Sequence, residues 1–232
     1  MADPMPESDG CAKESRGTLG QIFDPFAETE VYSHSRPHWC QSGVVVFITM
    51  RTHDSIPKEV IRRWDREKQE WVRRRGYSGK DHWTKVIPTL PSEDQFQFAK
   101  QFNRCREEFL DTCHGACRLR NPSLAAIVEK SLLHFDGERY ELGDFVIMPN
   151  HVHLLASFPS CEDMKNSCDS WMHFTARKIN IACGTRGKFW QQEPFDTLVR
   201  SPEQYDYLRQ YIRDNPIKAK LRNGEYLHRE LH

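Results

Sequence analysis

Two histidines, His151 and His153, lie two positions apart in the apolar segment 148–155. The segment has the character of a β-strand, in which side chains alternate between the two faces of the sheet. The two imidazoles therefore point the same way, and side by side on a rigid strand they offer two ligands to a divalent metal ion if another group completes the site. Two histidines on a solvated sheet face would show the same spacing, so the pair alone leaves both interpretations open.

A second group of polar side chains falls on a helix predicted to begin with Ser201 as the N-cap and Pro202 in its first turn. We expect this helix to end near residue 214, before Pro216. Residues four apart share a helix face, so Tyr207, Tyr211 and Asn215 form one stripe. The amide oxygen of Asn215 is a reasonable third ligand beside two histidines, and the Tyr211 hydroxyl would lie near the same metal ion. Alternatively, the tyrosines are packing residues with solvated hydroxyls.

Together these groups suggest chemistry at a phosphate. A metal ion would polarise the phosphate as a Lewis acid, and a tyrosine would attack it as a covalent nucleophile. A free tyrosine has a pKa near 10, so it needs a nearby cation or base to react at neutral pH. The phosphotyrosine bond conserves the energy of the phosphodiester, which makes the step reversible and favours strand transfer over simple hydrolysis.

The elements that would position these side chains form a recognisable order. A β-branched run at 44–50 predicts a buried strand, and the strands at 140–148 and 151–158 are joined by Pro149-Asn150. With a helix at 123–135 after the first strand, a helix at 162–182 and a strand at 195–200, the order is that of a split βαβ unit. We therefore predict an α+β, ferredoxin-like fold with a mainly antiparallel sheet, the histidine strand at its centre and a C-terminal helix that bears the tyrosine.

The remaining segments are elaborations on this unit. Helices are expected at 58–75 and 92–110, a loop at 76–91 and a short strand at 117–119. Residues 1–32 read as a disordered acidic tail, 33–222 as one domain and 223–232 as a C-terminal tail. No stretch approaches 18 uninterrupted apolar residues, which excludes a membrane protein.

Charge and cysteine content limit the partners and the compartment. The net charge is zero, but residues 1–32 carry seven acids and two bases, which leaves a surplus of five bases on the remainder. A basic body is compatible with phosphate binding. None of the eight cysteines forms a C-x-x-C pair and the N-terminus does not look like a secretory signal. We therefore expect free thiols and a cytoplasmic location.

Several blocks of the chain resemble one protein family. They are FVIMPNHVHLL at 145–155, SWMHFTARKIN at 170–180, FWQQEPFDTLVR at 189–200 and YIRDNPIKAKL at 211–221. In this order they resemble the single-tyrosine HUH (histidine-hydrophobe-histidine) transposases, in particular the REP-associated tyrosine transposases, or IS200-like transposases. The resemblance covers about residues 38–222.

The resemblance implies a specific site and reaction. Tyr211 would be the nucleophile, and His151, His153 and Asn215 would bind Mg²⁺ or Mn²⁺. The substrate would be single-stranded DNA, often with a hairpin or palindrome, and the product a 5′-phosphotyrosine and a free 3′-OH. The protein would be a DNA transposase with endonuclease and strand-transferase activity, and members of the family include dimers, so a homodimer is possible.

Candidate DNA contacts follow from residue type. Single strands are bound by basic grooves and aromatic platforms, which indicates Arg200, Arg213, Lys218 and Trp190. Ordinary surface charges and a core aromatic would look the same. Two other functions stay open: a domesticated hairpin-binding protein without cleavage activity, and a metal-dependent phosphoesterase that uses water.

Overall fold

The computed structural model describes residues 19–33, 37–77 and 81–231. Its strands are β1 (Glu30–Ser33), β2 (Pro37–Cys40), β3 (Val45–Arg51), β4 (Glu141–Ile147), β5 (His151–Ser157), β6 (Phe195–Leu198) and β7 (Leu227–Arg229). Its α-helices are α1 (Lys58–Arg74), α2 (Trp83–Val86), α3 (Ser92–Asp111), α4 (Pro122–Leu133), α5 (Cys161–Cys183) and α6 (Pro202–Lys218). Short 3₁₀ helices cover Ile87–Thr89 and Arg118–Arg120.

The main sheet has five strands in the order β6-β3-β5-β4-β7, and every neighbouring pair is antiparallel. Without the edge strand β7, the remaining four stand in the spatial order fourth, first, third, second along the chain. This is the ferredoxin-like arrangement, and it confirms the predicted α+β fold class. The histidine strand β5 lies at the centre, paired with β3 on one side and β4 on the other.

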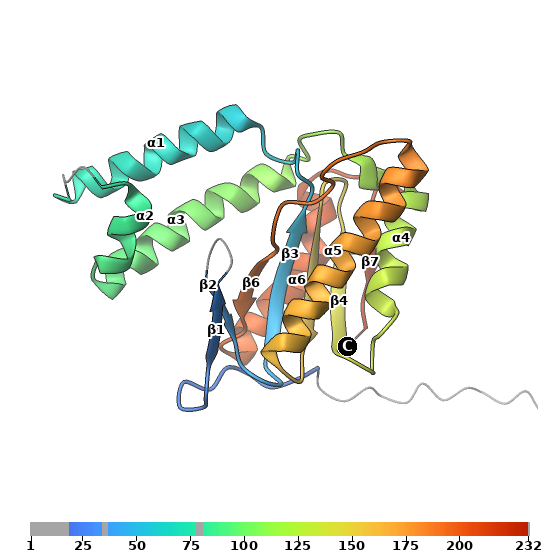
Figure 1. The fold of residues 1–232 in the computed structure, drawn as a ribbon, viewed down its shortest axis with the longest axis horizontal. Coiled ribbons are helices and arrows are strands. Elements are labelled where there is room, and N and C mark those ends of the chain that lie inside the picture. Colours follow the sequence, from blue (N-terminus) through green and yellow to red (C-terminus); the bar gives the residue numbers. More distant parts are fainter. Residues whose placement is uncertain (1–18, 34–36, 78–80, 232) are drawn as a thin grey trace, which may run out of the picture.

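Helices cover both faces of this sheet (Figure 1). On one face, β5 contributes Val152, Leu154 and Ala156 to a core shared with α4 and α5. On the other face, Leu155 of β5 packs in a cluster with Tyr211 and Ile212 of α6. Strand β5 is buried along its whole length, as expected for a strand covered from both sides. The two histidines therefore lie in the interior, and the solvated sheet face that their spacing left open is excluded.

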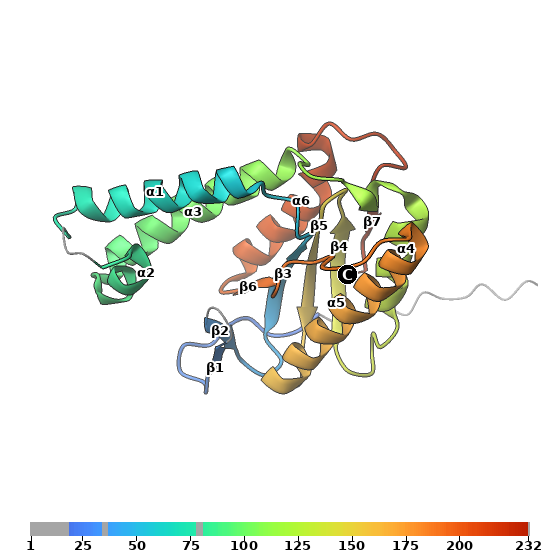
Figure 2. The same cartoon turned by 45° about the horizontal axis from the view of Figure 1, so that its top comes forward.

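An arm made of α1, α2 and α3 projects from the sheet (Figure 2). It has a small apolar core of its own, in which Trp71, Phe98 and Phe102 pack together. The loop predicted for residues 76–91 contains α2 and a 3₁₀ turn within the described residues. The near end of α3 returns to the sheet beside α6.

Both predicted tails contribute to the folded body, in contrast to the boundaries expected from the sequence. Leu19 is buried beneath the sheet and the Gln21 N–H donates to the Gly43 carbonyl. β1 then forms a hairpin with β2, and β7 in the C-terminal segment pairs with β4. These strands have only three or four residues, too few to show an alternating pattern in the sequence. Residues 1–18 of the predicted tail lie outside the described residues.

Two predicted local structures are wrong. Helix α6 does not stop at residue 214 but continues through Pro216 to Lys218. A proline so close to a helix end costs little beyond one hydrogen bond, and the end is closed by Ala219 and Leu221 N–H groups that donate to the carbonyls of Asn215 and Pro216. The strand predicted at 117–119 is instead a left-handed residue followed by a 3₁₀ turn.

The expectation of free thiols is also wrong for one pair. Cys40 at the end of β2 and Cys161 at the start of α5 form a disulfide, although they are 121 positions apart in sequence. Pairing over such a separation cannot be deduced from cysteine spacing, and the bond does not fit the reducing compartment that we expected. Among the described residues, no helix has the length and apolar character needed to cross a bilayer.

Candidate metal centre and tyrosine site

The two histidines of β5 are completely buried, and their ring centroids lie 4.6 Å apart. The His151 Nδ1 lies 2.7 Å from the Asn150 Oδ1. The Asn150 Nδ2 donates to the His114 carbonyl, which fixes the amide so that its oxygen faces the ring. Since that oxygen only accepts, His151 carries its proton on Nδ1 and presents a lone pair on Nε2.

The second ring is held in a similar way. The His153 Nδ1 lies 2.9 Å from the Thr49 Oγ1 on the neighbouring strand β3. The Nε2 atoms of both histidines are buried and have no hydrogen-bond partner. A metal-binding histidine usually has its other ring nitrogen held by a hydrogen bond that sets the ring's orientation. Both rings meet this condition.

Helix α6 places Tyr211 and Asn215 against the same two rings. The Tyr211 ring centroid lies 5.2 Å from that of His153, and Asn215 is completely buried one turn further on. The Tyr211 Oη and the Asn215 Oδ1 are buried and have no hydrogen-bond partner either. The predicted stripe on the last helix therefore meets the predicted face of the histidine strand. Tyr207 is also on this face of the helix, but it is 65% exposed.

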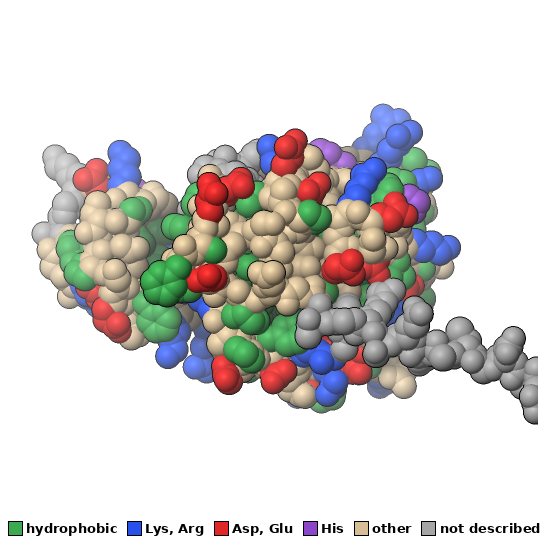
Figure 3. Space-filling model, turned by 90° about the horizontal axis from the view of Figure 1, so that it is seen from below, with side chains coloured by type: hydrophobic (Ala, Val, Ile, Leu, Met, Phe, Trp, Pro, Cys, Tyr) green, Lys and Arg blue, Asp and Glu red, His purple; other side chains and the backbone are tan. Residues whose placement is uncertain are grey.

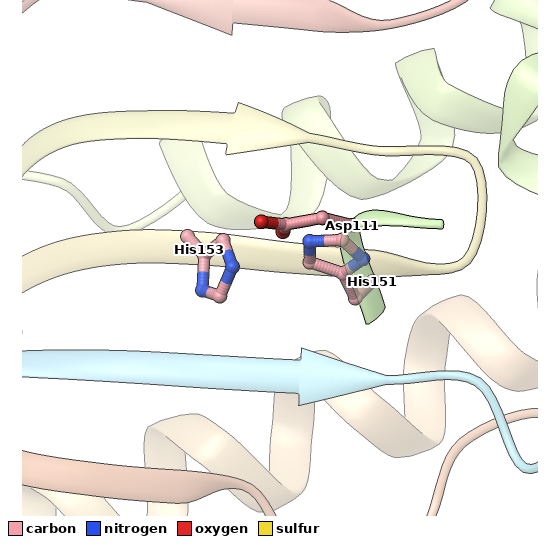
Figure 4. Close-up of side chains that lie close together, drawn as sticks. All are labelled: Asp111, His151 and His153. Carbon is pink, nitrogen blue, oxygen red and sulfur yellow. The ribbon is translucent and has the colours of Figure 1, made fainter. Parts of the chain in front are cut away.

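An acid that the sequence analysis missed completes the cluster. Asp111, the last residue of α3, lies so that one of its oxygens and a ring nitrogen from each histidine are all within 4.8 Å of one another (Figure 4). The Asn215 Nδ2 donates to the Asp111 Oδ1 over 3.1 Å. A carboxylate only accepts hydrogen bonds, so the NH₂ group of Asn215 must face it, and the amide oxygen is turned elsewhere.

The sequence held one weak sign of this acid. A carboxylate is disfavoured at the C-terminal end of a helix, where the helix dipole is negative, and Asp111 directly follows the helix predicted at 92–110. Nothing in its spacing relates it to residues 40 and 104 positions further along the chain. Only the packing of the arm against α6 brings it to the site.

Burial sets the protonation of these groups. Burial lowers the pKa of His151 to about 3 and that of His153 well below its ordinary value. Both rings are thus neutral at neutral pH, as metal ligands must be. Burial, followed by the charges of Asp111 and Glu107, raises the pKa of Tyr211, so its phenol carries a proton in the metal-free protein. Burial also raises the pKa of Asp111, while the hydrogen bond from Asn215 lowers it.

These residues fit a divalent cation. Two imidazole nitrogens, a carboxylate and an amide oxygen are mixed donors of the kind that several divalent ions accept. Four buried atoms without partners converge from β5 and α6, whereas buried polar atoms are nearly always hydrogen-bonded. A bound ion would satisfy the ring nitrogens and the amide oxygen. The donor set does not by itself select Mg²⁺ or Mn²⁺.

The residues predicted to contact DNA differ in how close they lie to the tyrosine site. The Lys218 Nζ lies 4.8 Å from the centroid of the Tyr211 ring, so this cation is at the site. Arg213 forms an ion pair with Glu230 over 2.8 Å. Arg200 precedes α6, whose first residue Pro202 is about 13 Å of helix rise from Tyr211.

Trp190 is buried in the core on the opposite face of the sheet, and its Nε1 donates to the Thr175 hydroxyl. Its ring is therefore a core aromatic rather than a platform for a base.

Comparison with known proteins gives only a distant structural likeness. No family model matches the sequence, and no curated protein matches it. Among solved structures, the chain is similar to one described as the structure of a REP-associated tyrosine transposase bound to a REP hairpin. The two are 14% identical, the match covers 81% of this chain and 74% of that chain, and the TM-score is 0.40. A likeness this distant says nothing about activity.

Proposed function

We propose that this protein is a metal-dependent enzyme that nicks and rejoins single-stranded DNA through a covalent bond between Tyr211 and a 5′-phosphate. One observation carries the proposal: a buried tyrosine hydroxyl without a partner lies beside a cluster of unpartnered metal-ligand atoms. These atoms are the Nε2 of His151, the Nε2 of His153 and the Oδ1 of Asn215. A structural tyrosine in a protein core would be expected to hydrogen-bond its hydroxyl.

In the proposed cleavage, Tyr211 replaces the 3′-oxygen on the phosphorus. The Tyr211 oxygen attacks the phosphorus, a P–O bond to tyrosine forms, and the bond from phosphorus to the 3′-oxygen breaks. The phenol proton has to leave, and Asp111 and Glu107 are the carboxylates whose charges act on this phenol. The departing 3′-oxygen takes up a proton. A divalent cation at the histidines would supply Lewis-acid polarisation of the phosphate. Attack by a 3′-OH on the phosphotyrosine reverses the step and rejoins a strand.

Lys218 has a defined place in this scheme. Its ammonium lies against the tyrosine ring and acts electrostatically on both Asp111 and Glu107. A cation at this position favours a phenolate as it forms and attracts the phosphate. It is the predicted DNA contact that the geometry supports best.

A covalent-capture assay tests the proposal. Labelled single strands from the DNA that flanks the gene are incubated with the protein and Mg²⁺ or Mn²⁺, then run on a denaturing gel. We expect label that migrates with the protein and is absent with a chelator and in Tyr211→Phe. Tyr207→Phe is the matched control, because it removes the same hydroxyl from the exposed tyrosine one turn earlier, and it should retain the adduct.

Other outcomes identify other functions. Cleavage without an adduct, retained in Tyr211→Phe, would indicate a phosphoesterase that uses water. Binding of hairpin strands with neither cleavage nor adduct would indicate a hairpin-binding protein. A homodimer stays a prediction, which light scattering on the purified chain would check.

A further inference from the structure

A polar hollow lies at the same end of the sheet as the metal centre, but on the opposite face of the sheet. It is a cavity of about 210 Å³ where β3 ends and the loop after α5 returns. In Figure 1 this is the upper end of the sheet. Its wall includes Thr52, Arg118, Asn180, Arg186, Lys188 and Phe189.

The charge of the hollow is positive. Arg118, Arg186 and Lys188 are all exposed, and none has an ion pair within the described part of the chain. One carboxylate, that of Asp54, also lines the hollow. It accepts a hydrogen bond from the Ala116 N–H over 2.8 Å, and the three cations outnumber it. At the opposite end of the molecule, acidic and basic side chains are interspersed (Figure 3).

An unpartnered hydroxyl adds an independent indication of a ligand. Thr52 is 3% exposed, lines the hollow, and its Oγ1 has no hydrogen-bond partner. A buried hydroxyl without a partner is unfavourable, so such groups are rare in native proteins and call for an explanation. A phosphate oxygen in the hollow would accept a hydrogen bond from it.

Two hydrogen bonds through Asn150 connect the wall of the hollow to the metal centre. The Thr52 N–H donates to the Asn150 carbonyl over 2.8 Å, and the side chain of Asn150 orients His151. Thr52 follows Arg51, which is the register partner of His151 across β3 and β5. The two sites thus lie on opposite faces of the sheet at the same end. A single strand of DNA that passes over this end of the sheet would contact both.

We infer that this hollow binds a phosphate group of the same single strand whose scissile phosphodiester is presented to Tyr211. The inference rests on the proposed function for the identity of the strand. The hollow holds the strand on one side of the scissile bond, and the three cations and the Thr52 hydroxyl supply its contacts to the phosphate. Charge-assisted hydrogen bonds of this kind position a nucleic acid without reading its sequence.

The test measures binding without cleavage. Affinity for labelled single strands is followed by fluorescence anisotropy with a chelator present, so Tyr211 chemistry does not contribute. We expect Lys188→Ala to weaken binding several-fold and to reduce the slope of log affinity against log salt by about 0.7, the value for one phosphate contact on a single strand. Thr52→Val, which removes only the buried hydroxyl, should weaken binding several-fold without a change in slope.

The matched control is Lys178→Ala, which removes the same charge from an exposed position on α5 where the ammonium lies over the Phe174 ring. It should bind like the parent protein. In a series of strands shortened from either end, the difference between the parent and Lys188→Ala should disappear once the nucleotide in the hollow is missing. Circular dichroism confirms that each variant is folded.

Three results would overturn the inference. The first is that Lys188→Ala and Thr52→Val both bind single strands like the Lys178→Ala control. The second is that the effect of Lys188→Ala persists on every shortened strand, which would indicate general electrostatic attraction. The third is that inorganic phosphate shifts the amide resonances of Thr52 and Lys188 while neither substitution changes the affinity for single strands, which would indicate a site for free phosphate only. Each can be seen whether or not a covalent adduct forms, so failure of the hollow and failure of the proposed function are distinguishable.

Discussion

The carboxylate of Asp111 should control metal affinity through the orientation of the Asn215 amide. The amide NH₂ donates to this carboxylate over 3.1 Å, and the amide oxygen has no partner. In Asp111→Asn the new side chain can donate as well as accept, so the Asn215 amide no longer has one preferred orientation. In Asp111→Leu the hydrogen bond is lost entirely.

The expected magnitude follows from that hydrogen bond. A hydrogen bond to a charged group is worth about 1.5–3 kcal/mol, and 1.4 kcal/mol corresponds to a factor of ten in affinity. Loss of an outer partner of a metal ligand costs roughly 10–100-fold in metal affinity in other proteins. We therefore expect Mn²⁺ to bind about tenfold more weakly to Asp111→Asn and about a hundredfold more weakly to Asp111→Leu. A direct Asp111–metal bond would make both losses larger.

The assay is titration of the metal-stripped protein with Mn²⁺, with free Mn²⁺ followed by electron paramagnetic resonance. The matched control is Glu108→Gln, which removes the same charge from an exposed position on the same helix, where Glu108 pairs with Arg104. It should change the dissociation constant by less than about twofold. If Asp111→Asn bound Mn²⁺ as tightly as this control, Asp111 would not control metal affinity through the Asn215 amide.

A stability measurement separates this role from a structural one. Burial raises the pKa of Asp111, so the ionised form of this carboxyl group is less favourable in the folded protein than in the unfolded chain. At neutral pH the metal-free Asp111→Asn variant should therefore be at least as stable to urea as the parent. A residue kept for stability would show the opposite, a loss of stability together with the loss of metal affinity.

Three further predictions address the cation at the site, the buried rings and the disulfide. Lys218→Ala should slow formation of the covalent adduct about tenfold and leave Mn²⁺ affinity nearly unchanged. The control Lys220→Ala should form the adduct at the parent rate. Quantitation of the adduct on gels over time checks both. Because the pKa of His151 is about 3 in the metal-free fold and near 6.5 in the unfolded chain, the unfolded chain takes up its proton first, and stability should fall as pH is lowered from about 6.5 toward 3. Urea midpoints across this range would contradict the expectation if they rose or stayed level. Cys40→Ser should lower the free energy of unfolding by about 4 kcal/mol, since the bridge closes a loop of more than 100 residues, and a midpoint equal to that of the parent would show that the bridge does not constrain the chain.

The parts of the site that the sequence predicted are those set by local periodicity. The period of two in a strand places both histidines on one face, and the period of 3.6 in a helix aligns Tyr211 with Asn215. The order of strands and helices matched a split βαβ unit, in which the histidine strand lies at the centre of the sheet. The interior position of the rings then follows from helices on both faces.

The parts that were missed depend on contacts between distant segments. Asp111 reaches the site because α3 returns to pack beside α6, and no local pattern encodes that return. Trp190 was predicted to face DNA because its type suits stacking, but the same large apolar ring also suits the core under α5, and packing decided between them. The helix end at Asn215-Pro216 was wrong because the rule against proline is weak in a last turn.

The placement of Asp111 has a consequence for how substrate reaches the tyrosine. The Tyr211 hydroxyl and both Nε2 atoms are buried, and Asp111 and Glu107 at the end of α3 are the acids that act on the phenol. A phosphate can contact these atoms only if a segment that covers them moves. We expect the end of α3 to move, because Asp111 there touches Asn215 beside the tyrosine. Such a movement would take Asp111 away from the Asn215 amide, and access of DNA would then be coupled to the orientation of the amide. The movement would let DNA reach the tyrosine, but it would also remove the partner that orients the metal-binding amide. Metal affinity should therefore be measured both with and without a bound DNA strand.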